Sequence, residues 1–321
     1  MAITIGVDVG GTNIVCGAVD ETGGVLLKLK QPTEAGKGHA EVLSRIAGMV
    51  RHIRAELGAE HDAKAVTAVG VGIPGLVDPI SGISRFAGNL NWRDIPVVSL
   101  LESELGIPVH IDNDVRMYVY GEAVAGAGRG IEHVLGITIG TGIAAAMVHG
   151  GQPYYGYKSM AGEIGHVRMD GVEDACSCGL NGCLETVASA SGMVRQAKKA
   201  LIEGRESVLG TWFPGQEIDR LTAAHLSQAM DQGDALATEI IARAGALTGQ
   251  ALAAAVMVLS PEAIVIGGGG ALAGERLLKP LREELFRLIL PDFREGLKVV
   301  TAEHNDDAGI IGSALYARHK Q

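Results

Sequence analysis

Short apolar runs alternate along the chain with longer segments whose apolar residues recur at helical spacing. Apolar residues 3–9 end at the corner Gly10-Gly11-Thr12, and a second apolar run over residues 14–19 predicts a β-hairpin. Residues 40–57 carry apolar side chains at helical spacing, and residues 65–73 predict a buried strand. The pattern next predicts a helix over 98–105, a strand over 109–111 and a helix over 115–124. Strands that alternate with helices are typical of an α/β protein.

The middle of the chain repeats this opening pattern. Residues 134–148 give an apolar strand, a second glycine corner at Gly140-Thr141-Gly142 and another apolar strand. Because residues 4–15 and 136–147 share one plan, we infer an internal duplication of a hairpin unit. Open backbone N–H groups in such corners bind anions, so two corners are suited to hold one polyphosphate from two sides.

The remaining elements are mostly helical. The pattern predicts helices over 185–201, 221–230 and 235–259, strands over 263–266 and 297–302, and a short helix that ends near Arg318. The most apolar stretch, residues 246–259, is too short and too interrupted to span a bilayer. We therefore expect a buried helix and no membrane partner.

Composition narrows the class of protein further. A chain of 321 residues and 33.3 kDa is typical of two domains, and 46 glycines suit an α/β protein with many tight turns. The net charge of −10, without any Lys/Arg cluster, argues against nucleic acid or anionic membranes as partners. The opening residues do not resemble a secretion signal, and we expect a cytoplasmic protein.

Three of the four cysteines lie between Ala161 and Glu185. Cys176, Cys178 and Cys183, with His166 upstream, form a Cys₃His set that can complete a tetrahedral zinc site. A full shell of protein ligands leaves no position for water, so this zinc is expected to be structural. A disulfide or inert thiols are the alternative.

Two carboxylates flank the expected metal loop. Glu163 precedes His166 by three residues, and Glu185 follows Cys183 by two. Carboxylate oxygens accept hydrogen bonds from the hydroxyl groups of a polyol, and a metal-braced loop would hold them rigid. The alternative is that both are solvated surface charges.

Two aspartates follow apolar strands. Asp8 ends the first strand and is suited to hold hydrated Mg²⁺ beside phosphates at the Gly10-Gly11-Thr12 corner; a plain tight hairpin is the alternative. Asp114 lies between a strand and a helix and is our candidate general base, with a helix N-cap as the alternative. The polar pair in Asn89-Leu90-Asn91-Trp92 is suited to sugar hydroxyl groups, unless these asparagines only form a turn.

Two glycine patterns require a test against dinucleotide binding. Gly70, Gly72 and Gly75 match G-x-G-x-x-G, but Pro74 begins a loop where the fingerprint requires a helix. Gly268, Gly270 and Ala273 satisfy a permissive form without the acidic partner that the fingerprint also requires. A nicotinamide dehydrogenase therefore ranks third among the functions considered, and the four-glycine corner Gly267 to Gly270 equally allows the backbone to pack against an adenine or a ribose.

Taken in order, these motifs resemble the ROK family of sugar kinases, within the actin/hexokinase-like superfamily. The matching residues are Asp8 to Thr12, Pro74-Gly75, Asn113-Asp114, Gly140 to Gly142, Glu163 to His166 and Cys176 to Glu185. The resemblance implies two actin/ribonuclease H-like α/β domains around a central cleft, with a small zinc-binding loop. The implied domains are residues 1–115, completed by a C-terminal helix over 306–321, and residues 116–305, with the zinc motif at 166–183.

The same resemblance implies transfer of the ATP γ-phosphoryl group to the 6-hydroxyl of a hexose, with Asp114 as the base and Mg²⁺ as a cofactor. The residues implied to hold the sugar are Gly75, Asn89, Asn113, Asp114, Glu163, His166 and Glu185. Those implied to face the nucleotide are Asp8, Gly10, Gly11, Thr12, Asn13, Thr141 and Gly142 at the phosphates and Gly268 and Gly269 at the nucleoside. His166 would also bind zinc, and a homodimer or a tetramer is implied.

Two departures from the family pattern concern the substrate. Residues 144–146 are alanines where the family usually continues with glycines, so we expect plain strand there. Arg116 replaces a small residue and bears on the surroundings of the sugar or phosphate. Glucose is our first choice because residues 89–93 look like the glucokinase branch; N-acetylmannosamine, N-acetylglucosamine, allose, mannose and fructose stay open. A non-catalytic sugar-sensing protein is the contrasting hypothesis.

Overall fold

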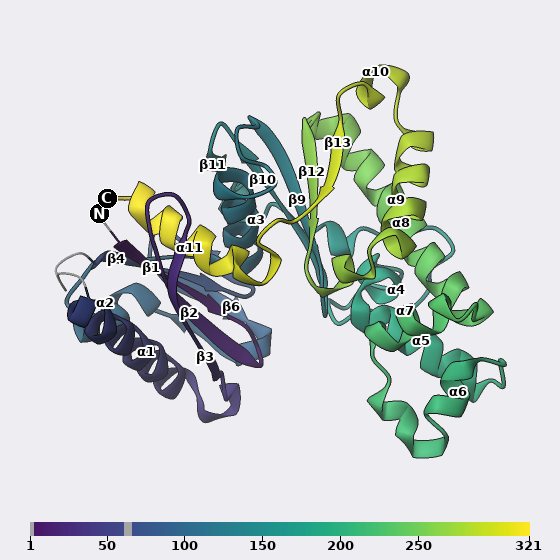
Figure 1. Ribbon diagram of the computed structural model, residues 1–321, viewed down its shortest axis with the longest axis horizontal. Helices are drawn as coiled ribbons and strands as arrows, with labels where there is room; N and C mark the ends of the chain where they lie inside the picture. Colours follow the sequence, from purple (N-terminus) through teal and green to yellow (C-terminus); the bar gives the residue numbers. More distant parts are fainter. Residues whose placement is uncertain (1–2, 61–65) are drawn as a thin grey trace. The chain divides into compact units, whose positions relative to one another are not determined.

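The structure, a computed structural model, describes residues 3–60 and 66–321. Its contacts divide the chain into two units, and each is described by itself (Figure 1). The first unit runs to Val134 and adds Ala146–Ala161 and Ala302–Gln321, while the second holds Leu135–Ala145 and Gly162–Thr301. The first unit therefore includes residues 116–134, 146–161 and 302–305 in addition to the N-terminal domain implied by the sequence.

A five-stranded sheet forms the centre of the first unit. Its first three strands pair antiparallel, whereas β1, β4 and β8 are parallel. The order across the sheet is β3 (Val25–Pro32), β2 (Asn13–Val19), β1 (Ile3–Val9), β4 (Val66–Ile73) and β8 (Val109–Asn113). The predicted hairpin and the next two predicted strands are thus confirmed, while β3 was not predicted.

Helices cover both faces of this sheet. Helix α1 (His39–Glu60) lies on one face, where Ile46 and Val50 join a buried apolar cluster with Ile5 and Val7 (Figure 1). Helix α2 (Val97–Leu105) packs against α1 and β8. Helices α3 (Asp114–Ala125) and α11 (Ala308–His319) pack against each other, and α11 crosses β1 and β4 on the opposite face.

Glycines set how closely α11 approaches the sheet. A Cβ atom at Gly6 would lie 1.8 Å from the carbonyl oxygen of Ile310, and one at Gly70 would lie 1.8 Å from that of Ser313. A Cβ at Gly312 of α11 would likewise lie 1.8 Å from the Met117 carbonyl oxygen of α3. Only residues without a side chain permit backbones this close.

A buried carboxylate anchors the segment that leads into α11. Glu122 of α3 is fully buried and accepts hydrogen bonds from four backbone N–H groups, those of Ala127 (3.0 Å), Glu303 (2.9 Å), His304 (2.7 Å) and Asn305 (3.1 Å). Buried carboxylates are stable only when they are paired in this way. The contacts therefore fix residues 303–305 against α3.

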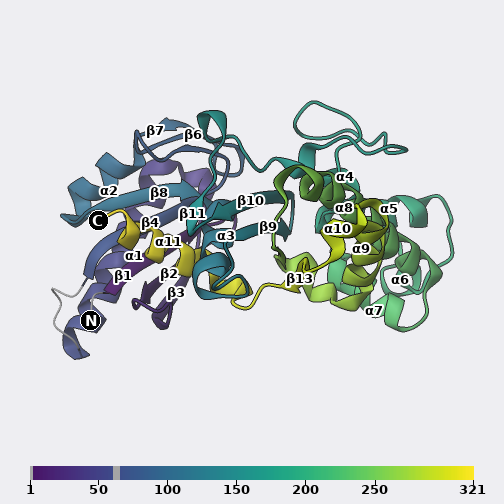
Figure 2. The ribbon, with the colours of Figure 1, turned by 90° about the horizontal axis from the view of Figure 1, so that it is seen from above.

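A small antiparallel sheet extends beyond β8, at the edge opposite β3 (Figure 2). It consists of β5 (Leu76–Asp78), β6 (Ile83–Ala87) and β7 (Trp92–Ile95), with a short 3₁₀ turn, η3 (Gly88–Leu90), before β7. This sheet was not predicted. Trp92, expected beside sugar-binding amides, is instead a core residue with 2% exposure.

The second sheet has the same plan as the first. Its order is β11 (Gln152–Pro153), β10 (Ile143–His149), β9 (His133–Ile139), β12 (Ala263–Gly267) and β13 (Lys298–Thr301). Position by position, β9 and β10 correspond to β1 and β2, and β12 and β13 run parallel as β4 and β8 do. The inferred duplication is confirmed, and the alanines at 144–146 form plain strand as expected.

Helices make up most of the second unit. They are α4 (Glu185–Ala188), α5 (Ala190–Ile202), α6 (Val208–Trp212), α7 (Ala223–Asp231), α8 (Ala235–Leu259), α9 (Glu275–Leu288) and α10 (Pro291–Arg294). The single helix predicted over 185–201 is wrong, because Ser189 is extended and its hydroxyl accepts the Gly192 N–H as the cap of α5. A 3₁₀ segment, η7 (Gly269–Ala273), likewise separates β12 from α9.

Helix α8 is longer than the apolar segment weighed from the sequence. Its 25 residues are long and apolar enough to cross a membrane by length and composition, with a mean hydropathy of 1.4 in the most apolar window. Of that window, 56% is buried inside the protein, and α8 packs along α9 (Figure 1). Such burial is typical of a core helix.

Candidate active site and metal centre

The first glycine corner connects β1 to β2. The Gly10 N–H donates to the Asn13 carbonyl (2.9 Å), which closes a tight turn and leaves Gly11 and Thr12 exposed. Thr33 holds the corner from the end of β3, because its hydroxyl donates to the Gly10 carbonyl (2.6 Å) and its N–H to the Thr12 carbonyl (2.8 Å). Thr33 was missed from the sequence, since the strand that leads to it was not predicted.

Asn113 and Asp114 lie where β8 ends and α3 begins. Asn113, not Asp114, caps the helix, because its side-chain oxygen accepts the Arg116 N–H (3.0 Å). The Asn113 amide donates to the Gly75 carbonyl and to Asp114 Oδ1, both at 3.0 Å. The Val115 N–H also donates to Asp114 Oδ1 (2.9 Å), so the carboxyl group is held in place through this oxygen.

Burial changes the acidity of the two aspartates. Loss of hydration raises the pKa of Asp114 to about 6. Loss of hydration, and then the neighbouring charge of Asp114, raises the pKa of Asp8 to about 7. The two carboxylates therefore lie near each other, and a cation between them and a phosphate would relieve their repulsion. A pKa near neutrality also suits a general base.

Gly75 and Asn89 adjoin these groups. Gly75 has a φ of +85°, and a Cβ there would lie 2.3 Å from the Phe86 carbonyl oxygen, so no side chain fits beside the small sheet. A Cβ at Gly11 would lie 3.3 Å from the Asn89 Cβ. The first unit therefore brings Gly75, Asn89, Asn113 and Asp114 near the Asp8 corner.

Arg116, in the first turn of α3, makes its contacts at the end of β8. It is buried, forms an ion pair with Asp112, and its guanidinium lies 4.8 Å from the centroid of the Tyr155 ring. Tyr155 also donates to Asp112 (3.0 Å). Arg116 thus supports the end of β8 through Asp112, next to Asn113 and Asp114, and its influence on the surroundings of the sugar or phosphate stays a prediction.

The second glycine corner lies in the second unit and is held in a similar way to the first. The Gly140 N–H donates to the Gly142 carbonyl (2.9 Å), and the Ser191 hydroxyl donates to the Thr141 carbonyl. Glu185 Oε2 accepts the Ile143 N–H (3.1 Å), and a Cβ at Gly142 would lie 2.3 Å from the same oxygen. Glu185 therefore adjoins the corner.

Gly268 and Gly269 begin the turn after β12. Gly268 has a φ of +79°, and a Cβ there would lie 2.7 Å from the Ile139 carbonyl oxygen. Gly269 is exposed, and a Cβ there would meet open space. The turn after β12 therefore has backbone without side chains, which a ligand can approach closely.

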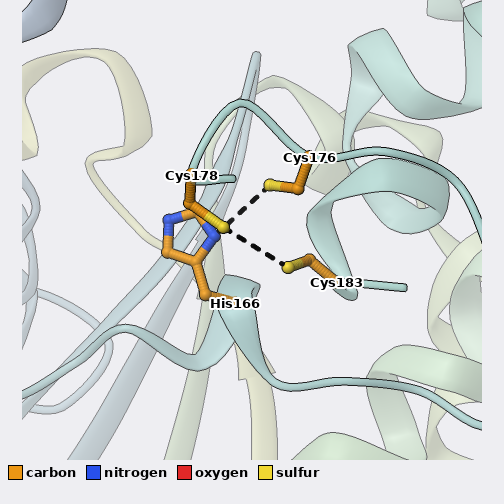
Figure 3. Close-up of side chains that lie close together, drawn as sticks. All are labelled: His166, Cys176, Cys178 and Cys183. Carbon is orange, nitrogen blue, oxygen red and sulfur yellow. Dashed lines mark hydrogen bonds between the residues drawn. The ribbon is translucent and has the colours of Figure 1, made fainter. Parts of the chain in front are cut away.

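The metal loop gathers the four expected ligands (Figure 3). The ligand atoms of His166, Cys176, Cys178 and Cys183 all lie within 4.8 Å of one another. A tetrahedral zinc with usual bond lengths places two sulfurs about 3.8 Å apart and a sulfur and a nitrogen about 3.6 Å apart. The Cys178–Cys183 sulfurs are 3.7 Å apart and Cys176 Sγ lies 3.6 Å from His166 Nδ1. The residues fit zinc.

The flanking carboxylates contact this cluster. Glu163 Oε2 lies 3.7 Å from His166 Nε2, the ring nitrogen that faces away from the cysteines, and Glu185 Oε1 lies 4.0 Å from Cys176 Sγ. A carboxylate beside the outer nitrogen of a metal-bound histidine fixes its tautomer. Burial raises the pKa of Cys183 to about 12, so this thiol needs the charge of a metal ion to bind as a thiolate.

Comparison with known proteins agrees with these features. The ROK family matches residues 4–320. A glucokinase from Halalkalibacterium halodurans is 36% identical over 319 residues, which cover 99% of this chain and 95% of the relative. A ROK family glucokinase from Streptomyces griseus, solved with glucose and AMPPNP, is 34% identical with a TM-score of 0.84 and covers 99% of this chain and 100% of its own. A putative xylose repressor from Caldicellulosiruptor is 28% identical and covers 97% of this chain and 77% of the relative. The chain belongs to the ROK family.

Proposed function

We propose that the protein is an ATP-dependent hexose kinase that phosphorylates the 6-hydroxyl of glucose, with Asp114 as the general base. The observation that carries this proposal is the half-buried Asp114, fixed by Asn113 beside Asp8 and with a pKa raised to about 6. A carboxylate of this kind is deprotonated at pH 7 and still basic enough to accept a proton from an attacking hydroxyl group.

The remaining roles follow the chemistry of the side chains. Asn89, Asn113, Glu163, His166 and Glu185 would bind sugar hydroxyl groups, and Gly75 leaves room for the ring. The exposed corner residues Gly11, Thr12 and Thr141, with Gly10, Asn13 and Gly142, would present N–H and hydroxyl groups to the phosphates. Gly268 and Gly269 would approach the nucleoside. Mg²⁺ held near Asp8 would supply positive charge to the transferring phosphoryl group.

Zinc would have a structural role. With four protein ligands the ion has no open position for a substrate or a water molecule. Because Glu163 and Glu185 adjoin the ligands His166 and Cys176, an ordered metal loop would hold both carboxylates for sugar binding.

Glucose is proposed because the relative from Halalkalibacterium halodurans is a glucokinase and the structure from Streptomyces griseus contains glucose and an ATP analogue. ATP is proposed as the donor for the same reason. A sugar-sensing role is the second candidate, since a putative xylose repressor also matches nearly the whole chain. We further propose a cytoplasmic homodimer.

The test is ATP-dependent ADP release with glucose, mannose, fructose, allose, N-acetylmannosamine and N-acetylglucosamine. We compare the wild type, Asp114→Asn and a control, Asp219→Asn, whose side chain is 85% exposed. We expect the highest kcat/KM with glucose, a loss of at least about 100-fold in Asp114→Asn and none in the control. If calorimetry shows that the wild type binds one of these sugars but no sugar causes ADP release, the sugar-sensing role replaces the kinase activity as the proposed function.

A further inference from the structure

A cavity lies in the first unit, apart from the residues proposed for catalysis. Its volume is about 870 Å³, within the range of small-molecule sites. Parts of β5, β6, β8 and α11 line it, together with residues 155–159. None of Asp8, Asn89, Asn113 and Asp114 lines it, so it is a separate site.

The cavity is lined with cationic groups. Arg85 is held by Asp78 (3.0 Å) and Asp94 (3.4 Å). Lys158 and Lys320 lie over the rings of Tyr157 and Tyr316, and within residues 3–60 and 66–321 neither ammonium group has a carboxylate within salt-bridge distance. Asp78 also lines the cavity, but it pairs with Arg85, so two lysines without a salt bridge leave positive charge at this cavity.

The aromatic and apolar residues that line the cavity suit an organic molecule rather than a bare ion. Tyr155 and Tyr316 line the cavity, and their hydroxyl groups lie 2.9 Å apart. Leu76, Pro79 and Ile80 add apolar surface, and Ile80 is 97% exposed. Aromatic and apolar surface with a few convergent charges is the usual composition of a small-molecule site.

We propose that this cavity binds a small organic phosphate through Lys158 and Lys320, with its carbon skeleton against Tyr155, Tyr316 and the apolar wall. Ammonium groups form charge-assisted hydrogen bonds to phosphate oxygens, and these bonds are about twice as strong as neutral ones. Arg85 is already neutralised by its two aspartates and has a secondary role.

The backbone at the rim supports a ligand-binding role. Lys158 and Ser159 have φ values of +53° and +58°, a conformation that non-glycine residues rarely adopt. Such residues are strained and persist where the surroundings fix them. Here Arg116 Nη2 donates to the Ser159 carbonyl (3.0 Å), which keeps Lys158 at the cavity.

This cavity also adjoins the segments that carry the proposed sugar-binding residues, an inference that rests on the proposed kinase function. Leu76 follows Gly75, His110 is on the strand that ends in Asn113, and Ser159 lies four residues before Glu163. Tyr155 bonds Asp112, which is two residues before Asp114. A bound phosphate therefore contacts the supports of the sugar site, and we expect it to change the apparent KM for the sugar by about fivefold or more.

Binding is measured first, without turnover, by calorimetry with fructose 1,6-bisphosphate, 3-phosphoglycerate and phosphoenolpyruvate as probes. The variants are Lys158→Gln/Lys320→Gln and a control, Lys30→Gln, which removes an exposed lysine of β3. We expect at least one probe to bind the wild type and the control equally, and the double variant at least tenfold more weakly. Asp114→Asn should bind as the wild type does, because it lies outside the cavity.

Two results would overturn the site: no binding of any probe to the wild type, or equal binding to the double variant. Displacement of the probe by glucose with AMPPNP, together with unaltered binding in the double variant, would place it in the active site instead. In the kinetic arm, an unchanged sugar KM at saturating probe would refute the coupling while leaving the binding site intact. A protein without kinase activity that still binds the probe would reject the proposed function alone.

Discussion

Asp114 as the base makes a specific prediction about pH. The carboxylate accepts a proton only when it is deprotonated, and burial raises its pKa to about 6. Activity should therefore be fully present above that pKa and be lost as the pH falls through it. The parameter to follow is kcat/KM for glucose at saturating MgATP, because it reports on the enzyme before the sugar binds and glucose itself does not titrate there.

The magnitude follows from the pKa of about 6. About nine-tenths of Asp114 is deprotonated at pH 7 and about one-tenth at pH 5, so kcat/KM should fall about tenfold between these values. Asp8, whose pKa is raised to about 7, would add a second step if its protonation weakened Mg²⁺ binding. Excess Mg²⁺ favours the ionised form of Asp8 and moves that step to lower pH, whereas the Asp114 step stays near pH 6.

The assay is ADP release from pH 5 to pH 8 with excess Mg²⁺, in the wild type and in Asp114→Asn. The residual rate of the variant should be at least about 100-fold lower and should lack the step near pH 6. A slope that the variant retains away from pH 6 reports the titration of ATP or of Asp8 and is divided out of the wild-type profile. A wild-type profile that stays flat from pH 7 to pH 5, or the same step in both proteins, would refute the assignment of the base.

Three further predictions concern stability and the metal. Cys178→Ser should lose its zinc, measured by elemental analysis, and a full zinc content would contradict the metal site. The variant should also have a higher KM for glucose, because Glu163 and Glu185 adjoin the metal ligands His166 and Cys176. Gly70→Ala should lower the free energy of unfolding, measured by urea titration, by about 3 kcal/mol or more, because the new Cβ would lie 1.8 Å from the Ser313 carbonyl oxygen. The control is Gly48→Ala, because a Cβ at Gly48 would meet open space. Glu122→Gln should destabilise by about 2–4 kcal/mol, since four backbone N–H groups lose a charged acceptor; a change under ~1 kcal/mol would mean that the segment finds other partners.

The duplicated hairpins were predictable because their signals are local. A strand, a glycine corner and a second strand occupy adjacent residues, and the same plan recurs at β9 and β10. The metal ligands were predictable for a related reason, because three cysteines lie within eight residues, Cys176 to Cys183, of one loop. The helix predicted over 235–259 is confirmed with the same bounds in α8, and its burial was expected as well.

Contacts between distant residues could not be predicted from the sequence. The small sheet of β5 to β7 depends on strands of three to five residues, too short for a clear alternation of apolar and polar positions. Trp92 was expected beside sugar-binding amides, where its indole would contact sugar hydroxyl groups, yet the small sheet folds it into the core. The Arg116–Asp112 ion pair is local, since the two residues are four apart, but nothing in the sequence indicates that Tyr155 arrives from a later segment and contacts both of them.

The close contact between α11 and the glycines of β1 and β4 determines when the first unit can fold during synthesis. The ribosome makes both strands early, but α11 emerges only after the whole second unit has been made. Until then, the face of the sheet that bears Gly6 and Gly70 has no partner, so the unit that begins the chain is expected to finish folding last. Proteins usually complete their N-terminal domains first during translation. Here a nascent chain stalled before residue 308 should keep that face open to chaperones.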